Sequence, residues 1–177
     1  MRNDIQEILV THEEIQKRAI ELGEIITKDY QGKDVVIIGL LKGCAPFMME
    51  LIQHIETYIT IDFMTVSSYT GTSSGDLILK KDISTDVKGR HVLIAEDIVD
   101  TGRTLKAVSD MFINRGALSV EVVTLLDKPE GRIIPFLPKY IGFTVPNKFV
   151  VGFGLDYNEL YRNLPYVGVL KKEIYEK

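Results

Sequence analysis

Three short, largely apolar runs constrain the fold of this 177-residue chain more than any other feature. Runs rich in β-branched side chains, without regular polar alternation, are typical of strands buried on both faces of a parallel sheet. A further strand is expected at residues 59–66, and a helix at 104–115 that Gly116 ends. The order strand, helix, strand predicts a βαβ unit with a right-handed crossover, and hence an α/β domain. The three runs are residues 35–41, 91–95 and 120–126.

Two more helices are expected nearer the N-terminus. Thr11 and Glu14 have the spacing of a capping box, in which each side chain bonds the other residue's backbone amide. Pro46 suits the first turn of a second helix at residues 46–52. After the capping box, apolar residues recur at helical spacing and predict a helix that covers the core with one face: Ile15, Ala19, Leu22 and Ile26.

Two regions depart from this regular pattern. Residues 67–82 contain a long tract of serine, threonine and glycine around Tyr69, and a polar loop of this length in a compact domain is usually functional. We expect a lid there. From residue 129 onward, short apolar pieces lie among proline, glycine and asparagine, which predicts a small, irregular hood over the main sheet. Residues 1–177 should form one domain, with its core at about 10–128 and its hood mainly at about 129–177.

Composition limits the partners and the compartment. A net charge of −4, with no run of lysine or arginine, excludes a general attraction to nucleic acid. The single cysteine, Cys44, excludes an internal disulfide and a multi-cysteine metal site. The apolar runs are far shorter than the roughly 20 residues that cross a bilayer, and the first residues lack the order of a signal peptide. We therefore expect a cytoplasmic protein that binds neither membranes nor nucleic acid.

The chemistry is concentrated in residues 91–105. The apolar run delivers Glu96 and Asp97 to the carboxyl end of a strand, where open α/β sheets bind their ligands. Adjacent strand residues point to opposite faces, so the two acids should reach different partners, such as sugar hydroxyls and a metal. Residues 100–104 then turn the chain into a helix and present hydroxyls and amides at its positive end. This turn predicts a site for one phosphate.

Other motifs fail on spacing. The glycine patterns of the Walker loop and of the dinucleotide loop are absent from the sequence, and Asp97 and Asp100 are too far apart for a phosphatase-type Asp-x-Asp pair. Alternatively, these residues have no binding role and form only a capped helix after a strand, with Asp100 or Thr101 as the cap. Two adjacent acids at a strand end are costly unless a cation or a hydroxyl meets them, which favours a binding site.

Residues 92–105 resemble the motif with which type I phosphoribosyltransferases bind phosphoribosyl pyrophosphate (PRPP), and are most similar to the hypoxanthine-guanine branch. The resemblance implies a mostly parallel central sheet flanked by helices, with a small C-terminal and N-terminal hood over the active site. Other segments match the same family in the family's order, over about residues 40–170: the pyrophosphate loop at 40–43, the flap at 68–69, the segment 125–129 with the base-reading lysine, and the purine-binding hood at 145–152 and 155–158, with Arg162 after it.

The resemblance implies an enzyme of purine salvage that uses Mg²⁺ to join PRPP to hypoxanthine or guanine, giving IMP or GMP and pyrophosphate. Asp100 would exchange a proton near N7 of the purine. Lys128 can donate but not accept, which suits a 6-oxopurine and not adenine. A homodimer or homotetramer is expected. The implied contacts are Glu96, Asp97, Asp100, Thr101, Gly102, Arg103 and Thr104 for the ribose phosphate, Lys42, Gly43 and Arg162 for pyrophosphate, Ser68 and Tyr69 in the flexible loop, Lys128, Phe149 and Val150 for the base, and Glu96, Asp97 and Asp156 for the metal.

The resemblance also implies an unusual, cis backbone between Leu41 and Lys42. Cys44, Arg103 and Asn147 depart from the family's usual residues, but none is a proposed catalytic group, so they bear on fine specificity. The rivals are an enzyme that prefers xanthine or adenine, and a regulator that keeps the fold, binds nucleic acid, and senses PRPP or nucleotide without turning it over. The acidic balance of the chain, together with its pyrophosphate and metal residues, favours catalysis over regulation.

Overall fold

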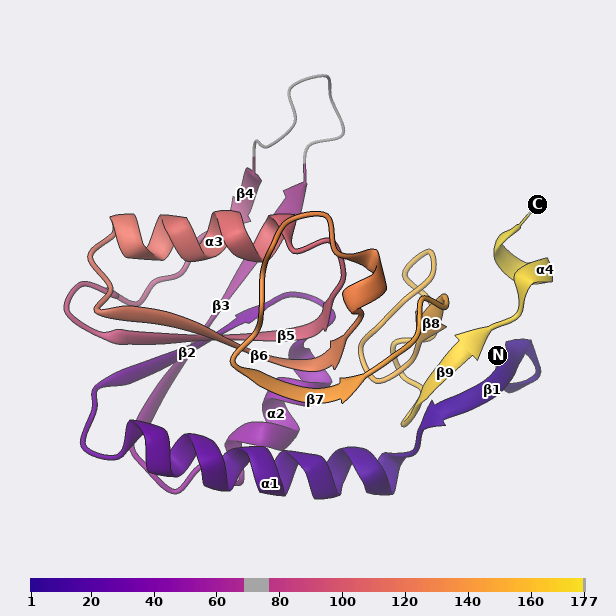
Figure 1. Ribbon diagram of the computed structural model, residues 1–177, viewed down its shortest axis with the longest axis horizontal. Coiled ribbons are helices and arrows are strands. Elements are labelled where there is room, and N and C mark those ends of the chain that lie inside the picture. The colour runs from indigo at the N-terminus through magenta and orange to yellow at the C-terminus, as the bar shows by residue number, and fades with distance from the viewer. Residues whose placement is uncertain (69–76, 177) are drawn as a thin grey trace.

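The computed structural model describes residues 1–68 and 77–176. Its largest element is a six-stranded sheet with the order β4-β3-β2-β5-β6-β7 (Figure 1). All neighbours pair in parallel except β4, which is antiparallel to β3 at one edge, so the predicted mostly parallel sheet is confirmed. The strands are β2 (Val35–Leu40), β3 (Ile59–Ser68), β4 (Leu77–Lys81), β5 (His91–Val99), β6 (Ser119–Asp127) and β7 (Tyr140–Thr144).

Helices cover both faces of this sheet. α1 (His12–Tyr30) and α2 (Ala45–Ile52) lie on one face, and α3 (Arg103–Asn114) lies on the other (Figure 1). Within β2, Ile37 belongs to the core cluster under α1 and α2, whereas Ile38 belongs to the cluster under α3. Because successive side chains of a strand point to opposite faces and both faces are covered, every residue of β2 is buried.

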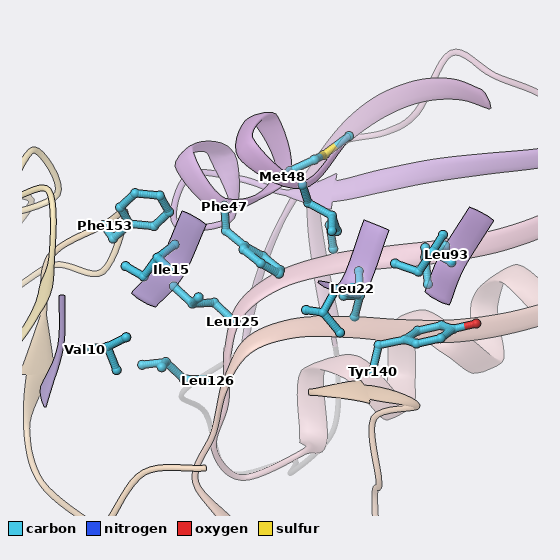
Figure 2. Close-up of a cluster of buried hydrophobic side chains, with 14 of the residues drawn as sticks. Val10, Ile15, Leu22, Phe47, Met48, Leu93, Leu125, Leu126, Tyr140 and Phe153 are labelled. Carbon is cyan, nitrogen blue, oxygen red and sulfur yellow. The ribbon is translucent and has the colours of Figure 1, made fainter. Parts of the chain in front are cut away.

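The predicted apolar stripe of α1 is its contact with the sheet. Ile15, Ala19 and Ile26 are 0% exposed. Figure 2 shows Ile15 of α1 near Phe47 of α2 and Leu125 of β6, with Leu22 further along the same cluster. Burial of each large apolar side chain stabilises the fold by roughly 1.5–3 kcal/mol, as an upper estimate.

The ends of the helices also follow the sequence. The capping box is present: Thr11 Oγ1 accepts from the Glu14 amide at 3.3 Å, and Glu14 Oε2 accepts from the Thr11 amide at 2.8 Å. Pro46 stands in the first turn of α2. Beyond α3, Gly116 has a φ of +89°, so the residue predicted to stop this helix takes up the left-handed conformation that ends it.

The hood is a second, antiparallel sheet with the order β1-β9-β8 (Figure 1). It joins both ends of the chain, because β1 (Ile5–Val10) pairs with β9 (Val167–Leu170), and β8 is the short strand Val150–Val151. Val10, Val167 and Phe153 of the hood share one core cluster with α1 and the main sheet. Short helical turns complete the fold: η1 (Arg2–Asp4), η2 (Pro129–Gly131) and α4 (Lys172–Tyr175).

Two boundaries differ from the sequence prediction. Residue 129 was expected to begin the hood, but β7 returns to the main sheet and pairs with β6, because its apolar residues find a free parallel edge there. Residues 67–82 were expected to form one loop, but β3 continues to Ser68, and β4 pairs back onto it. Tyr69 and the residues up to 76 lie outside the described residues. Within the described ranges, no helix combines the length and the apolar character needed to span a membrane.

Candidate active site

A cavity of about 400 Å³ opens at the carboxyl ends of β2 and β5, beneath the hood. Three segments that are distant in the sequence meet there: the turn after β2, the turn from β5 into α3, and the hood loop that follows β8. Each segment contributes charged or hydroxyl side chains. The polar residues that line the cavity include Lys42, Glu96, Asp97, Asp100, Thr101, Thr104, Asp156 and Arg162.

The turn from β5 into α3 has the form expected of an anion site. Gly102 is the N-cap residue of α3, with a φ of +81°, and has no side chain to cover the first amides of the helix. The Arg103 amide donates to Thr101 Oγ1 at 3.4 Å, near the limit of hydrogen bonding. Asp100 does not cap the helix, because its carboxylate contacts Lys128 Nζ at 2.8 Å. The capped-helix alternative therefore fails for Asp100, and of the two caps that it offered only Thr101 bonds an amide of the helix start.

Glu96 and Asp97 lie within β5 rather than beyond its end, because the strand continues to Val99. Both acids line the same cavity, as do Ile98 and Val99 that follow them, so the cavity runs along the end of the strand. The ladder between β5 and β6 pairs His91 to Glu96 and resumes at Ile98, so regular pairing is interrupted at Asp97. The Asp97 carboxylate turns back to accept from the Ile98 amide at 2.8 Å.

Burial governs the charge of these two acids. It raises the pKa of Glu96 well above its ordinary value, and the neighbouring charge of Asp97 raises it further. Burial also raises the pKa of Asp97, against hydrogen bonds from Glu96 and the Ile98 amide and the positive charge of Arg162. Glu96 Oε2 is buried without a hydrogen-bond partner among the described residues. An unpaired buried carboxyl oxygen is costly, so this corner of the cavity is built for a hydroxyl or a cation.

The loop after β2 packs directly against Asp97. The peptide bond between Leu41 and Lys42 is cis, as expected from the resemblance. Gly43 approaches the acid so closely that a Cβ built on it would lie 1.7 Å from Asp97 Oδ2. Only glycine fits at that position. Cys44, next along the chain, is fully buried, and burial followed by the charges of Glu96 and Asp97 raises the pKa of its thiol.

The hood supplies the remaining charges. Arg162 Nη2 lies 2.9 Å from Asp156 Oδ1, and Arg162 Nη1 donates to the Gly154 carbonyl at 2.8 Å. Glu159, which the sequence analysis did not single out, contacts Lys42 Nζ at 2.5 Å and Arg162 Nη2 at 3.0 Å. Its position three residues from both Asp156 and Arg162 was the available signal.

None of the three residues expected to bind the base is among those that line the cavity. Lys128 follows β6 and reaches the cavity through its ion pair with Asp100. Phe149 and Val150 stand at the start of β8 and are not among the lining residues. The Phe149 ring stacks on Tyr175 of α4 with centroids 4.7 Å apart, and meets Tyr157 edge-on at 5.6 Å. Of the expected flexible loop, the backbone of Ser68 ends β3, and Tyr69 lies outside the described residues.

The parallel sheet, the phosphate-type turn and the hood define a class of enzyme. The sequence profile of the phosphoribosyl transferase domain matches residues 6–158, and the chain belongs to this family. Within it, the chain falls among the hypoxanthine-guanine phosphoribosyltransferases. Relatives of that name are 57% identical over 177 residues in Streptococcus pneumoniae strain R6, with 99% of this chain and 98% of the relative covered, and 59% identical over 175 residues in Lactococcus lactis, with 98% and 95% covered.

Solved structures agree with this assignment. A hypoxanthine phosphoribosyltransferase from Staphylococcus aureus superposes with a TM-score of 0.97 at 51% identity, covering 100% of this chain and 97% of that one. A hypoxanthine phosphoribosyltransferase from Trypanosoma cruzi, in complex with the product IMP, superposes with a TM-score of 0.93 at 40% identity, covering 97% of each chain. The resemblance found in the sequence motifs is thereby confirmed over the whole chain.

Proposed function

We propose that this enzyme transfers the 5-phosphoribosyl group of PRPP to N9 of hypoxanthine or guanine, giving IMP or GMP and pyrophosphate in purine salvage. The observation that carries the proposal is the meeting of an uncovered helix end, two buried acids and the pair Lys42 and Arg162 around one cavity. A ribose that bears a phosphate at one end and a pyrophosphate at the other needs these three kinds of partner in this arrangement.

Each of the three segments that line the cavity would bind a different part of PRPP. The 5′-phosphate would occupy the turn from Asp100 to Thr104, where Thr101, Gly102 and Thr104 line the cavity at the start of α3. Glu96 and Asp97 would accept from the ribose hydroxyls. Lys42, the Gly43 amide and Arg162 would hold the pyrophosphate, with the planar guanidinium suited to two phosphate oxygens.

The base would bind between Lys128 and the hood. The Lys128 ammonium would donate to O6, Phe149 would stack on the ring, and the backbone of Val150 would meet the far edge. An ammonium has no lone pair, so it leaves the amino group of adenine facing a donor and favours a carbonyl at that position. The ion pair between Lys128 and Asp100 supports this arrangement, because it holds the O6 donor beside the proton acceptor.

In the reaction, N9 forms a bond to the anomeric carbon of the ribose as the bond to the pyrophosphate oxygen breaks. Positive charge develops on the ribose ring and negative charge on the leaving group, so Arg162 and Lys42 act where charge increases. The purine gives up one proton, and Asp100 would accept it near N7. Excluding water matters because water competes with N9 for the same carbon.

The acids of the cavity fit a magnesium ion shared with the substrate. No cluster of three metal-binding side chains occurs among the described residues. Mg²⁺ is usually held by one or two carboxylates together with phosphate oxygens, so one or two of Asp156, Glu96 and Asp97 would suffice if PRPP completes the shell. A bound Mg²⁺ would neutralise charge on the pyrophosphate.

The test is a substrate panel. The purified protein is incubated with PRPP, Mg²⁺ and one of hypoxanthine, guanine, xanthine or adenine, and nucleotide formation is followed; a parallel sample contains EDTA. We expect IMP and GMP to form, slow or no reaction with adenine, and loss of turnover with EDTA. Best activity with xanthine would identify the xanthine-preferring alternative. Binding of PRPP without turnover of any base would identify the regulator.

We further expect the protein to act in the cytoplasm as a homodimer or homotetramer, with only small molecules as substrates. Light scattering on the purified chain measures the assembly directly. A monomer with full turnover would contradict the expected assembly and leave the proposed reaction intact.

A further inference from the structure

Glu159 bridges the two cationic side chains of the proposed pyrophosphate site. Its Oε2 lies 2.5 Å from Lys42 Nζ, and its Oε1 lies 3.0 Å from Arg162 Nη2. These cations come from different segments of the chain, Lys42 from the loop after β2 and Arg162 from the hood. The two oxygens of this one carboxylate therefore contact the same two cations that two oxygens of a bound pyrophosphate would contact.

The carboxylate is ionised at neutral pH. The hydrogen bond from Lys42 lowers the pKa of Glu159, and the bond from Arg162 lowers it further. Both long side chains are largely in water, with 67% of Lys42 and 62% of Glu159 exposed. An exposed ion pair such as that of Glu159 with Lys42 is weak, so an incoming polyanion can displace this carboxylate at small cost.

The hood loop aims Glu159 at this position. Asn158 and Glu159 have φ values of +51° and +64°, a conformation that residues with a Cβ adopt rarely. The turn is closed by paired backbone bonds between Tyr157 and Leu160, at 3.2 and 3.0 Å, and by the Glu159 amide, which donates to Asp156 Oδ2 at 2.9 Å. A strained turn persists only where the surroundings hold it, and it frequently marks a functional position.

We propose that Glu159 is a positioning residue that competes with pyrophosphate for Lys42 and Arg162. The Glu159 carboxylate occupies both cations in the free enzyme, gives them up to the pyrophosphate group of PRPP, and returns to them as pyrophosphate leaves. It thereby weakens the affinity for pyrophosphate and keeps the site from being held by its product. The inference rests on the proposed function, because it assumes that these two cations bind pyrophosphate.

If the role of Glu159 were purely structural, its removal would change the affinity for pyrophosphate in the opposite direction. If the carboxylate served only to hold Lys42 and Arg162 in place, its removal would loosen both cations and weaken pyrophosphate binding. If it competes, its removal tightens binding. Because exposed ion pairs are weak, the expected gain is modest, about three- to tenfold in the dissociation constant.

The experiment titrates the purified enzyme with inorganic pyrophosphate in the presence of Mg²⁺ by calorimetry. Glu159→Gln keeps the size of the side chain and the backbone bond to Asp156 while removing the charge. Glu24→Gln, an exposed position on α1, removes the same charge far from the cavity. We expect about three- to tenfold tighter binding for Glu159→Gln and unchanged binding for Glu24→Gln. Equal or weaker binding by Glu159→Gln would overturn the inference.

Steady-state kinetics gives a second readout. In Glu159→Gln the KM for PRPP should fall by a similar factor and product inhibition by pyrophosphate should strengthen, while the KM for hypoxanthine stays constant. A parallel rise of both KM values would indicate general damage and contradict competition. The two proposals fail separately: an unmodified enzyme that neither binds pyrophosphate nor forms nucleotide contradicts the proposed function, whereas an active enzyme that Glu159→Gln leaves unchanged contradicts only the role of Glu159.

Discussion

The cavity has two halves that are held in place by different forces. The half delivered by the main sheet, Glu96 to Thr104 and Lys128, stands on buried parallel strands, and Asp97 is itself only 9% exposed. The half delivered by the hood, Asp156 to Arg162, is a turn fixed by ion pairs and by residues with positive φ. If the proposed function holds, the sheet would fix where ribose and base react, while the hood would supply charges that change partners during a cycle.

The largest expected effect is on the sheet side. Asp100→Asn removes the proton acceptor while keeping its shape, so turnover should fall by roughly 10²–10⁴-fold with little change in PRPP affinity. Turnover is measured by steady-state kinetics, and PRPP affinity by calorimetry. Asp110→Asn, on the exposed face of α3, is the matched control. An equal loss of affinity and turnover would mean that Asp100 serves only to hold the turn, and the two halves would then not differ as described.

The next effect is on the hood side. Arg162→Lys keeps the charge but loses the planar contacts to Asp156 and to the Gly154 carbonyl, so kcat/KM for PRPP should fall by roughly 10- to 100-fold. The change should appear mainly in the KM for PRPP. Arg115→Lys, which affects an ion pair with Asp82 outside the cavity, tests the cost of the substitution itself. If only the KM for the purine rises, Arg162 would act on the base. That result would contradict the division of the cavity into a sheet half and a hood half.

A smaller effect concerns the choice of base. Lys128→Gln supplies a group that accepts as well as donates, so the preference for hypoxanthine over adenine should narrow by about tenfold in kcat/KM. Competition between the two bases at a fixed PRPP concentration measures this ratio. Lys106→Gln, on the surface of α3, serves as the control. An unchanged ratio would show that the hood, and not the sheet, reads the exocyclic group.

The smallest expected effect concerns Asp62 on β3, whose role is in the stability of the sheet and not in catalysis. Burial tends to raise the pKa of Asp62, but hydrogen bonds from the amides of Phe63, Thr85 and Ser84 outweigh it and hold this pKa below its usual value. The stabilisation is therefore complete above the unfolded-state pKa of about 3.9, and it is lost as the pH falls through the lower folded-state pKa.

Asp62→Asn should lower the free energy of unfolding by about 1 kcal/mol at neutral pH, with little effect on the KM for PRPP. The difference from the unmodified enzyme should shrink at strongly acidic pH. Urea unfolding followed by circular dichroism at several pH values measures it. A difference that stays constant across acidic pH would show that the charge of Asp62 is not the cause.

The sequence predicts the centre of the main sheet well because β2 and most of β5 and β6 are buried on both faces, so that their apolar composition alone marks residues 35–41 and 120–126. The predicted end of β5 was too early. Glu96 and Asp97 are polar, which suggests the end of a strand, but the strand continues through them to Val99. The pairing of β1 with β9 joins residues about 160 apart, which no local pattern encodes.

For the site, the motifs that lie on one turn were predictable and those that depend on contacts across the cavity were not. Residues 100–104 carry their phosphate chemistry in their own order along the chain. Glu159 has only its spacing of three residues from Asp156 and Arg162 as a signal, because its importance comes from its contact with Lys42, more than 100 positions earlier. The stacking of Phe149 on Tyr175 was likewise hidden, since it depends on how the last helix folds back over the hood.

The pairing of β1 with β9 gives the hood two covalent tethers. The chain leaves the hood at Val10 to begin α1, and returns to it from β7 near Val145, so two separate connections join the hood to the main sheet. A single protease cut between β7 and β8 would leave the C-terminal fragment clamped by its hydrogen bonds to β1 and by the shared core. The nicked protein should stay together on a sizing column and come apart only in denaturant.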